Sequence, residues 1–160
     1  MLEQSQSIRQ DIVRLRRDLH AHPEIGFQEI RTSGVVADRL QELGFENVQT
    51  RVGRTGVVAE LGPNDGPIIG IRADMDALPI QEETPHDFRS QNDGLMHACG
   101  HDCHTSILLG AAQLLKNDFD ANGSNWRGRV RFLFQPCEEM FDENGNLTGT
   151  ENYKDGELVE

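Results

Sequence analysis

The chain has 160 residues, of which 36% are hydrophobic, so it can bury one core, and we expect a single domain. Its formal net charge of -12 argues against a nucleic-acid partner, because phosphate binding needs clustered Lys and Arg, and it favours the attraction of metal cations. Nothing in the sequence approaches a membrane span or the apolar core of a signal peptide, so we expect no membrane association and a cytoplasmic protein.

Two amphipathic helices are predicted near the start of the chain. Apolar residues recur at helical spacing over 7–20, and again over 28–43, where Gly44 fits the C-terminal cap. The apolar face of the second helix is Ile30, Val35, Val36, Leu40 and Leu43. Two histidines at the end of the first helix, His20 and His22, are expected to be structural unless the fold brings them inward.

Short strands are predicted next, over 48–52, 56–61 and 68–71. The run 68–71 is apolar on both faces, as expected of an interior strand in a sheet that helices cover. No periodicity persists over 79–100, and an irregular stretch of this length predicts a loop at a functional site.

The second half of the chain predicts a helix over 105–117, a polar loop over 118–125 and a strand over 129–135. Residues 140–160 are acidic and rich in Asn and Gly, and they predict a loop that enters a short helix near 151–157. The order of these elements predicts an α/β fold with a mixed sheet rather than a strictly alternating, doubly wound one.

The densest group of possible metal ligands is the segment 97–104, HACGHDCH. Imidazole, thiolate and carboxylate groups bind zinc and the neighbouring transition metals. If the segment is extended, Cys99 and His101 share a face and can converge on one ion, while Asp102 points elsewhere and could steady a ligand. Gly100 between them permits a close approach or a sharp turn. A structural zinc knot, a buried core cysteine and solvated histidines are the alternatives.

The chain has three cysteines, two of them in this histidine-rich segment. An odd number of cysteines, without a secretion signal, argues against a disulfide framework. Metal binding is therefore the alternative to disulfide formation as an explanation for these cysteines.

Two pairs of carboxylates follow predicted strands. Glu138 and Glu139 are adjacent, so their side chains point in different directions, and one can bind a metal while the other faces a water as a general base. Asp74 and Asp76 alternate at the end of another strand, at the edge where open α/β sheets collect ligands. A solvated loop for the first pair and a strand-end turn for the second are the alternatives.

Four segments resemble the signatures of N-acyl-amino-acid amidohydrolases, hippurate hydrolases and indole-acetyl-amino-acid hydrolases, which belong with carboxypeptidase G and the aminoacylase-like zinc peptidases. The segments are HAHPEIGFQE, IRADMDALPI, MHACGHDCHT and FQPCEE. They occur in the order of that family and extend from about residue 14 to residue 139. Four collinear motifs are far more specific than any one of them and strongly favour a metal site.

The resemblance implies that Cys99, His101 and Glu139 are metal ligands, that Glu138 is the general base that activates a water, and that Asp76 lies beside the site and orients a ligand. It implies a catalytic α/β domain with a mixed sheet, into which a smaller lid domain, commonly used for dimerisation, is inserted. It also implies two divalent ions of zinc, manganese, cobalt or nickel. The implied activity is metal-dependent hydrolysis of the amide bond of N-acyl amino acids, such as hippurate and N-acetyl conjugates, by a homodimer.

Two cysteines depart from the family pattern, which usually has a small or apolar residue in place of Cys103 and Ala or Gly in place of Cys137. Either could crowd the site, add a stray thiolate or make the site oxidisable. The stretch after Glu139 also lacks the glycines that are usual in the family.

The resemblance further implies that two more metal-binding histidines, the lid domain and the return of the catalytic domain lie beyond residue 160. We therefore expect the 160-residue chain alone to be an incomplete and inactive N-terminal part of the catalytic domain, with residues 140–160 as an acidic tail. A catalytically incomplete metal-binding remnant and a structural or regulatory module are the alternatives to an enzyme.

Overall fold

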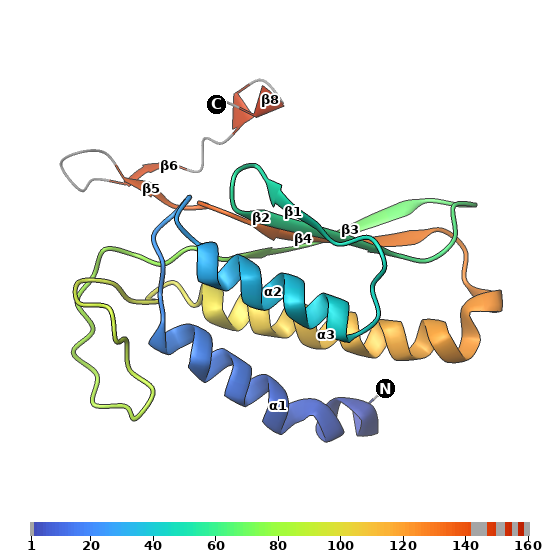
Figure 1. Cartoon of the computed structure of the whole chain (residues 1–160), viewed down its shortest axis with the longest axis horizontal. Coiled ribbons are helices and arrows are strands. Elements are labelled where there is room, and N and C mark those ends of the chain that lie inside the picture. The colour runs from blue at the N-terminus through green and yellow to red at the C-terminus, as the bar shows by residue number, and fades with distance from the viewer. Residues whose placement is uncertain (1, 142–146, 150–152, 155–156, 159–160) are drawn as a thin grey trace.

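The computed structural model describes residues 2–141, 147–149, 153–154 and 157–158, in which helices and sheet form separate layers (Figure 1). The helices are α1 (Leu2–Ala21), α2 (Ile30–Glu42), α3 (His101–Asn122) and a 3₁₀ turn, η1 (Gly123–Asn125). The main strands are β1 (Gln49–Val52), β2 (Gly56–Leu61), β3 (Ile68–Asp74) and β4 (Arg129–Gln135). Two short pairs follow: β5 (Met140–Phe141) with β6 (Leu147–Gly149), and β7 (Tyr153–Lys154) with β8 (Glu157–Leu158).

The four main strands form one mixed sheet in the order β1-β2-β4-β3. β1 pairs with β2 and β2 with β4 in antiparallel fashion, whereas β3 and β4 are parallel, in a register that places Asp74 opposite Gln135. The predicted α/β fold with a mixed sheet is therefore confirmed. Because β3 and β4 are parallel, the chain leaves both strands at the same edge of the sheet.

The prediction that 68–71 is an interior strand is wrong. Within the described part of the chain β3 pairs only with β4, and its first two residues, Ile68 and Ile69, are 45% and 61% exposed. Burial is complete only at its end, at Ala73 and Asp74. The interior strands of this sheet are β2 and β4, which each have hydrogen-bonded neighbours on both sides.

Helix boundaries differ from the sequence prediction at two helices. α1 begins at Leu2 rather than at residue 7, and α3 runs from His101 to Asn122 rather than over 105–117. The last turns of α3 are polar, and pairs of side chains four residues apart stabilise them. The Nζ atom of Lys116, for example, lies 2.6 Å from Oδ1 of Asp120. The predicted loop over 118–125 is therefore mostly helix. Gly44, with φ +82°, has the left-handed conformation expected of a residue that follows a helix.

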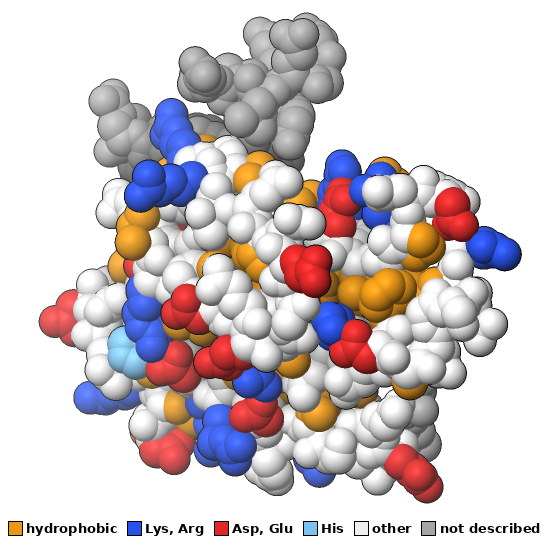
Figure 2. Space-filling view, turned by 45° about the vertical axis from the view of Figure 1, so that its right-hand side comes forward, with side chains coloured by type: hydrophobic (Ala, Val, Ile, Leu, Met, Phe, Trp, Pro, Cys, Tyr) orange, Lys and Arg blue, Asp and Glu red, His pale blue; other side chains and the backbone are white. Residues whose placement is uncertain are grey.

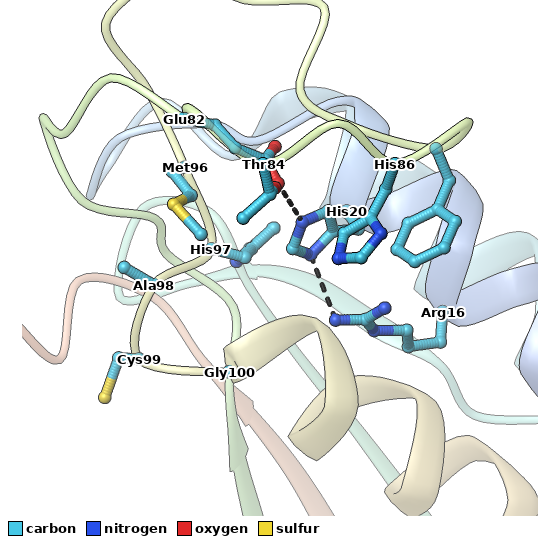
Figure 3. A pocket seen from close by; sticks show the side chains of 11 residues that line it. Arg16, His20, Glu82, Thr84, His86, Met96, His97, Ala98, Cys99 and Gly100 are labelled. Atoms are coloured by element: carbon cyan, nitrogen blue, oxygen red, sulfur yellow. Dashed lines mark hydrogen bonds and ion pairs between the residues drawn. The ribbon is translucent and has the colours of Figure 1, made fainter.

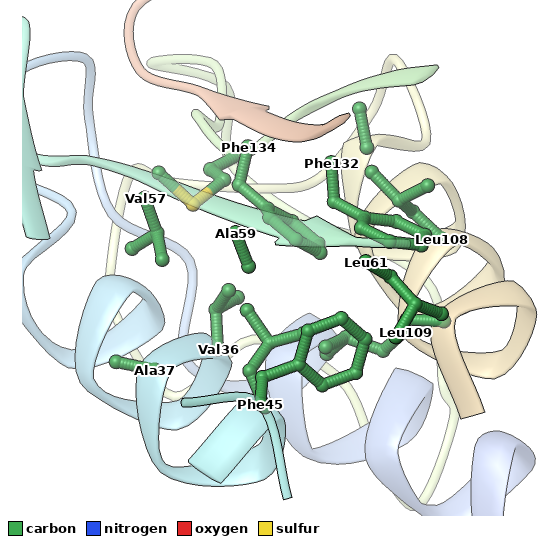
Figure 4. Close-up of a cluster of buried hydrophobic side chains, with 14 residues drawn as sticks. Val36, Ala37, Phe45, Val57, Ala59, Leu61, Leu108, Leu109, Phe132 and Phe134 are labelled. Carbon is green, nitrogen blue, oxygen red and sulfur yellow. The ribbon is translucent and has the colours of Figure 1, made fainter. Parts of the chain in front are cut away.

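The hydrophobic core lies between the sheet and the helices α2 and α3, and α1 covers α3 from outside (Figures 1 and 4). Phe132 of β4 meets Phe45 edge-to-face, with ring centroids 5.5 Å apart. Gly110 of α3 lets α1 approach closely, because a Cβ at this position would lie 3.3 Å from the Ile12 side chain. Ile30 was assigned to the apolar face of its helix but is 71% exposed, because it is the first residue of α2 and lies at its end.

The predicted short helix near 151–157 is wrong for the residues that the structure describes there. Residues 153–154 and 157–158 pair as the antiparallel strands β7 and β8. The Asp-Gly dipeptide at 155–156 is a hairpin signal in the sequence that outweighs helix propensity over so short a segment.

Acidic and basic side chains are interspersed on the face shown in Figure 2. This face therefore offers no continuous basic patch among the described residues, in keeping with the negative net charge. None of the described helices is both long and apolar enough to cross a membrane.

We expect the substitution Phe132→Ala to lower the free energy of unfolding by about 3–5 kcal/mol, because it removes a fully buried ring from the central strand. Ile107→Ala on α3 is the control: this side chain is 65% exposed, and the change should stay within about 0.5 kcal/mol. Urea unfolding followed by circular dichroism measures both, and equal losses would contradict the described core.

Candidate metal centre

The polar side chains of the candidate site come together where β3 and β4 end and α3 begins. Asp74 and Asp76 lie at the end of β3, Glu138 and Glu139 follow β4, and His101 is the first residue of α3. The parallel pairing of β3 with β4 puts both strand ends at one edge of the sheet, which is where open α/β sheets collect their ligands.

The segment around Cys99 turns sharply and is not extended, so that part of the prediction is wrong. Gly100 has φ +88° and caps the N-terminus of α3, which begins at the next residue. Glycine populates this left-handed region without steric cost, whereas a residue with a Cβ would be strained there. The turn at Gly100, rather than strand alternation, brings Cys99 and His101 together.

Cys99, His101 and Glu139 each offer one ligand atom, and these atoms lie within 4.8 Å of one another. One carboxylate oxygen of Glu139, Oε2, is buried without a hydrogen-bond partner among the described residues. A thiol, an imidazole and a carboxylate at this separation are a donor set that suits zinc and similar transition-metal ions. The residues present therefore fit a divalent cation.

Asp76 contacts two of these residues at once and is itself buried. The Nδ1 atom of His101 lies 2.9 Å from the Asp76 carbonyl oxygen and 3.1 Å from its Oδ1. This geometry assigns the proton to Nδ1 and leaves Nε2 as the atom available to an ion. The Asp76 Oδ2 atom accepts a hydrogen bond from the backbone N–H of Glu139, at 2.9 Å. Asp76 thus lies where it orients both a histidine ring and the Glu139 backbone.

Negative charge dominates the electrostatics of the cluster. Burial raises the pKa of Cys99, and the charges of Glu139 and Glu138 raise it further. Burial also raises the pKa of Glu139, although His101 opposes that shift. For His101, burial alone would lower the pKa, but the Asp76 hydrogen bond and the carboxylates around it raise it. Each of these shifts favours the protonated form, so a bound ion competes with protons for the three groups.

The structure also brings together Asp74, His101 and His104, whose ligand atoms lie within 4.8 Å of one another. The Nδ1 atom of His104 is 3.3 Å from Asp74 Oδ2, and Arg72 pairs with Asp74 Oδ1 at 3.0 Å. Asp74 and His104 both lie in segments that the sequence marks as possible ligand sources, but neither residue is assigned a role from the sequence alone. Their 30-residue separation hid the contact, which becomes predictable only once β3 and α3 are known to meet end to end.

His20 is brought inward by the fold and is only 4% exposed. Its Nδ1 atom is 2.7 Å from Asp102 Oδ2 and its Nε2 atom is 3.2 Å from Glu82 Oε1, while Arg16 pairs with Asp102 at 2.8 Å. Asp102 therefore points away from the proposed ligands, as predicted, and holds His20 and Arg16. Among the described residues its side chain makes no hydrogen bond to Cys99, His101 or Glu139, so the suggestion that it steadies a ligand is wrong. His22 stays half-exposed, and its Nδ1 atom lies 2.7 Å from the backbone carbonyl oxygen of Asp18 in α1.

A pocket of about 300 Å³ lies beside this network, lined by residues of α1 and of the irregular stretch before α3 (Figure 3). Cys99 borders it, but its thiol points away from His20 and His97. His97 is buried without hydrogen-bond partners among the described residues, and burial lowers its pKa to about 4. The Cys99 thiol is therefore not directed toward the His20 and His97 side of the pocket.

The two cysteines that depart from the family pattern have different surroundings. Cys137 is buried, and burial raises its pKa to about 12, so its side chain stays a protonated thiol rather than a stray thiolate. Cys103 is half-buried near the start of α3. Neither belongs to a group of three possible metal ligands within the part of the chain that the structure describes.

Known proteins resemble this chain in sequence and in fold. Residues 70–158 match the model of peptidase family M20/M25/M40. An N-acetylcysteine deacetylase of Bacillus subtilis is 48% identical over 130 residues, which are 81% of this chain and 33% of that protein. An N-acyl-L-amino acid amidohydrolase of Geobacillus stearothermophilus is 48% identical over 135 residues, 84% of this chain and 35% of that protein.

A crystal structure from Bacillus subtilis, described as a dinuclear metal binding peptidase of family M20, superimposes with a TM-score of 0.74 at 45% identity. The match covers 82% of this chain and 36% of that one. The chain therefore spans about a third of the length of the relatives that it matches.

The geometry predicts that Cys99→Ala lowers the metal content of the purified chain and that Cys103→Ala does not. Of the cysteines, all of which lie in the described part of the chain, only Cys99 belongs to a set of possible ligand atoms with His101 and Glu139. Elemental analysis after dialysis against Zn²⁺ or Co²⁺ measures the effect, and the thiolate-to-Co²⁺ absorption band should disappear in Cys99→Ala alone. Equal losses in both variants would show that the thiol ligand is misassigned.

Metal affinity should rise with pH, because the raised pKa of Cys99 keeps a proton on the thiol that the ion must displace. Displacing one proton makes the apparent association constant rise about tenfold per pH unit below the pKa of the thiol. Calorimetric titration with Zn²⁺ in mildly acidic and mildly alkaline buffers tests this dependence. Cys99→Ala should show a shallower slope, and an unchanged slope would mean that Cys99 is not the titrating ligand.

Proposed function

Because the chain belongs to peptidase family M20/M25/M40, we propose that it is the N-terminal part of the catalytic domain of a metal-dependent amidohydrolase that cleaves N-acyl amino acids. The observation that carries the proposal is the group formed by Cys99, His101 and Glu139, with Glu138 beside it. The relatives named for N-acyl amino acid and N-acetylcysteine hydrolysis support this substrate class.

We propose Cys99, His101 and Glu139 as ligands of one of two divalent ions, of zinc, manganese, cobalt or nickel. Asp76 would keep the Nε2 atom of His101 directed at that ion through the hydrogen bonds to Nδ1. When bound, the metal would act as a Lewis acid on the substrate carbonyl and lower the pKa of a water. The description of a structural relative as dinuclear supports the number of ions.

Glu138 is proposed as the general base. Its Oε2 atom is 3.8 Å from the Nε2 atom of His101, and its side chain is 20% exposed, so the carboxylate borders the ligand group while remaining open to solvent. It would take a proton from the water that attacks the amide carbon and then give it to the leaving nitrogen. The C–N bond breaks, and the products are a carboxylic acid and a free amino acid.

Substrates with small or aromatic acyl groups, N-acetyl amino acids and hippurate, are the ones to assay first. The N-acetyl class is supported by the deacetylase relative, and hippurate by the sequence motifs. The competing function, a metal-binding remnant without catalysis, would bind Zn²⁺ or Co²⁺ equally well but release no amino acid. Binding and turnover therefore have to be measured on the same preparation.

Glu138→Gln should retain its metal and lose turnover by about 10²–10⁴-fold, because an amide cannot accept the proton of the attacking water. The assay measures amino acid released from N-acetylmethionine or hippurate by the whole gene product, with metal content determined in parallel. Glu46→Gln, at an exposed residue between α2 and β1, is the matched control and should leave turnover unchanged. Turnover by Glu138→Gln close to that of the unsubstituted protein would refute the assignment.

A further inference from the structure

The side chain of Glu29 is a fully buried carboxylate. Along the sequence, Glu29 is far from the proposed metal ligands. Its Oε1 atom accepts a hydrogen bond from the backbone N–H of Cys137 at 2.8 Å, and its Oε2 atom accepts one from the Thr55 hydroxyl at 2.5 Å. Glu29 precedes α2, Thr55 lies in the turn between β1 and β2, and Cys137 follows β4. Burying a carboxylate is costly unless hydrogen bonds compensate, so this three-way contact is a specific feature of the fold.

The residue that Glu29 holds lies in an uncommon backbone conformation. Cys137 has φ +48°, in the left-handed region that residues with a Cβ seldom adopt. Gly26 packs against the same residue: a Cβ at Gly26 would lie 2.5 Å from the Cys137 Sγ atom. The turn after β4 is thus fixed by the N-terminal segment of the chain, and the next two residues along it are Glu138 and Glu139.

The turn is anchored at both ends by buried carboxylates. Glu29 accepts the N–H of Cys137, and Asp76 accepts the N–H of Glu139. With both backbone amides bound, the peptide units between them have little freedom to rotate. The directions of the Glu138 and Glu139 side chains therefore depend on both anchors.

We propose that Glu29 is a positioning residue that sets the direction of Glu138 and Glu139 through the backbone N–H of Cys137. The inference rests on the proposed function, because it gives Glu29 a role in the site that this function assigns. This role requires a side chain long enough to place an acceptor oxygen at the Cys137 N–H, and it does not require a negative charge. Burial raises the pKa of Glu29, which agrees with a role that a neutral acceptor can fill.

Two substitutions of Glu29 distinguish the effect of side-chain length from the effect of charge. Glu29→Gln keeps the length and a carbonyl acceptor for the Cys137 N–H, and its amide can donate to the Thr55 oxygen. Glu29→Asp keeps the charge but is one methylene shorter, so it cannot reach both partners. In the whole gene product, we expect Glu29→Asp to weaken Co²⁺ binding about tenfold and to lower kcat on the order of 10–100-fold with little change in KM. Glu29→Gln should restore both values to within about threefold of the unsubstituted protein.

Glu24→Asp is the matched control from the same segment. The Glu24 carboxylate accepts the backbone N–H groups of Arg31 and Thr32, at 2.9 and 2.7 Å, at the start of α2. Shortening it should lower the urea midpoint and leave Co²⁺ affinity, the Co²⁺ absorption spectrum and kcat unchanged. A purely structural role for Glu29 would give Glu29→Asp the same pattern as Glu24→Asp, and that result overturns the inference.

Circular dichroism establishes that each variant is folded before binding is measured. If Glu29→Asp does not fold, the variant Thr55→Val takes its place, because this substitution removes only the hydroxyl that donates to Glu29. A Co²⁺ absorption spectrum of Thr55→Val identical to that of the unsubstituted protein would then overturn the inference. An unsubstituted protein that binds no Co²⁺ refutes the proposed function itself. Normal Co²⁺ binding and turnover in the unsubstituted protein, with an unaffected Glu29→Asp, refutes only the role of Glu29.

Discussion

The parallel pairing of β3 with β4 is the constraint on which the candidate site depends. Two parallel strands deliver their carboxyl ends to the same edge of a sheet, so the carboxylates that follow each strand must meet. Asp76 uses this meeting directly: it follows β3 and accepts the backbone N–H of Glu139, which follows β4. An antiparallel arrangement of the same two strands would place these carboxylates at opposite edges.

The site accumulates negative charge that the fold alone does not neutralise. Asp74, Asp76, Glu138 and Glu139 converge on one histidine and one thiol, and the shifts in the pKa of Cys99, Glu139 and His101 all favour the protonated forms. Buried like charges are unfavourable unless a cation or a proton joins them. This physical need for a cation agrees with membership of a family that contains a structure described as a dinuclear metal binding peptidase.

The segment between α1 and α2 stabilises the fold and contacts the turn after β4 without contributing a candidate ligand. Glu24 caps α2, Gly26 allows Cys137 to approach, and Glu29 binds the Cys137 backbone. These contacts give a physical reason for the glutamates and the glycine of the motif HAHPEIGFQE, which also contains His20 and His22. Of those histidines, only His20 becomes part of a buried network, and that network supports the irregular stretch before α3.

Local signals in the sequence determined the helices, most strand boundaries, the mixed α/β class and the resemblance to a metallopeptidase family. These follow from hydrophobic periodicity, from Gly44 and from short motifs, all of which act over a few residues. Only the tertiary structure decided that β2 and β4, rather than β3, are the interior strands of the described sheet. It also decided that the segment around Gly100 turns sharply rather than being extended, and that Asp102 pairs with His20. It also brought Asp74 to His104 and Glu29 to Cys137, across 30 and 108 residues. Such contacts depend on strand order and on the meeting of distant ends, and residue spacing along the chain carries no information about either.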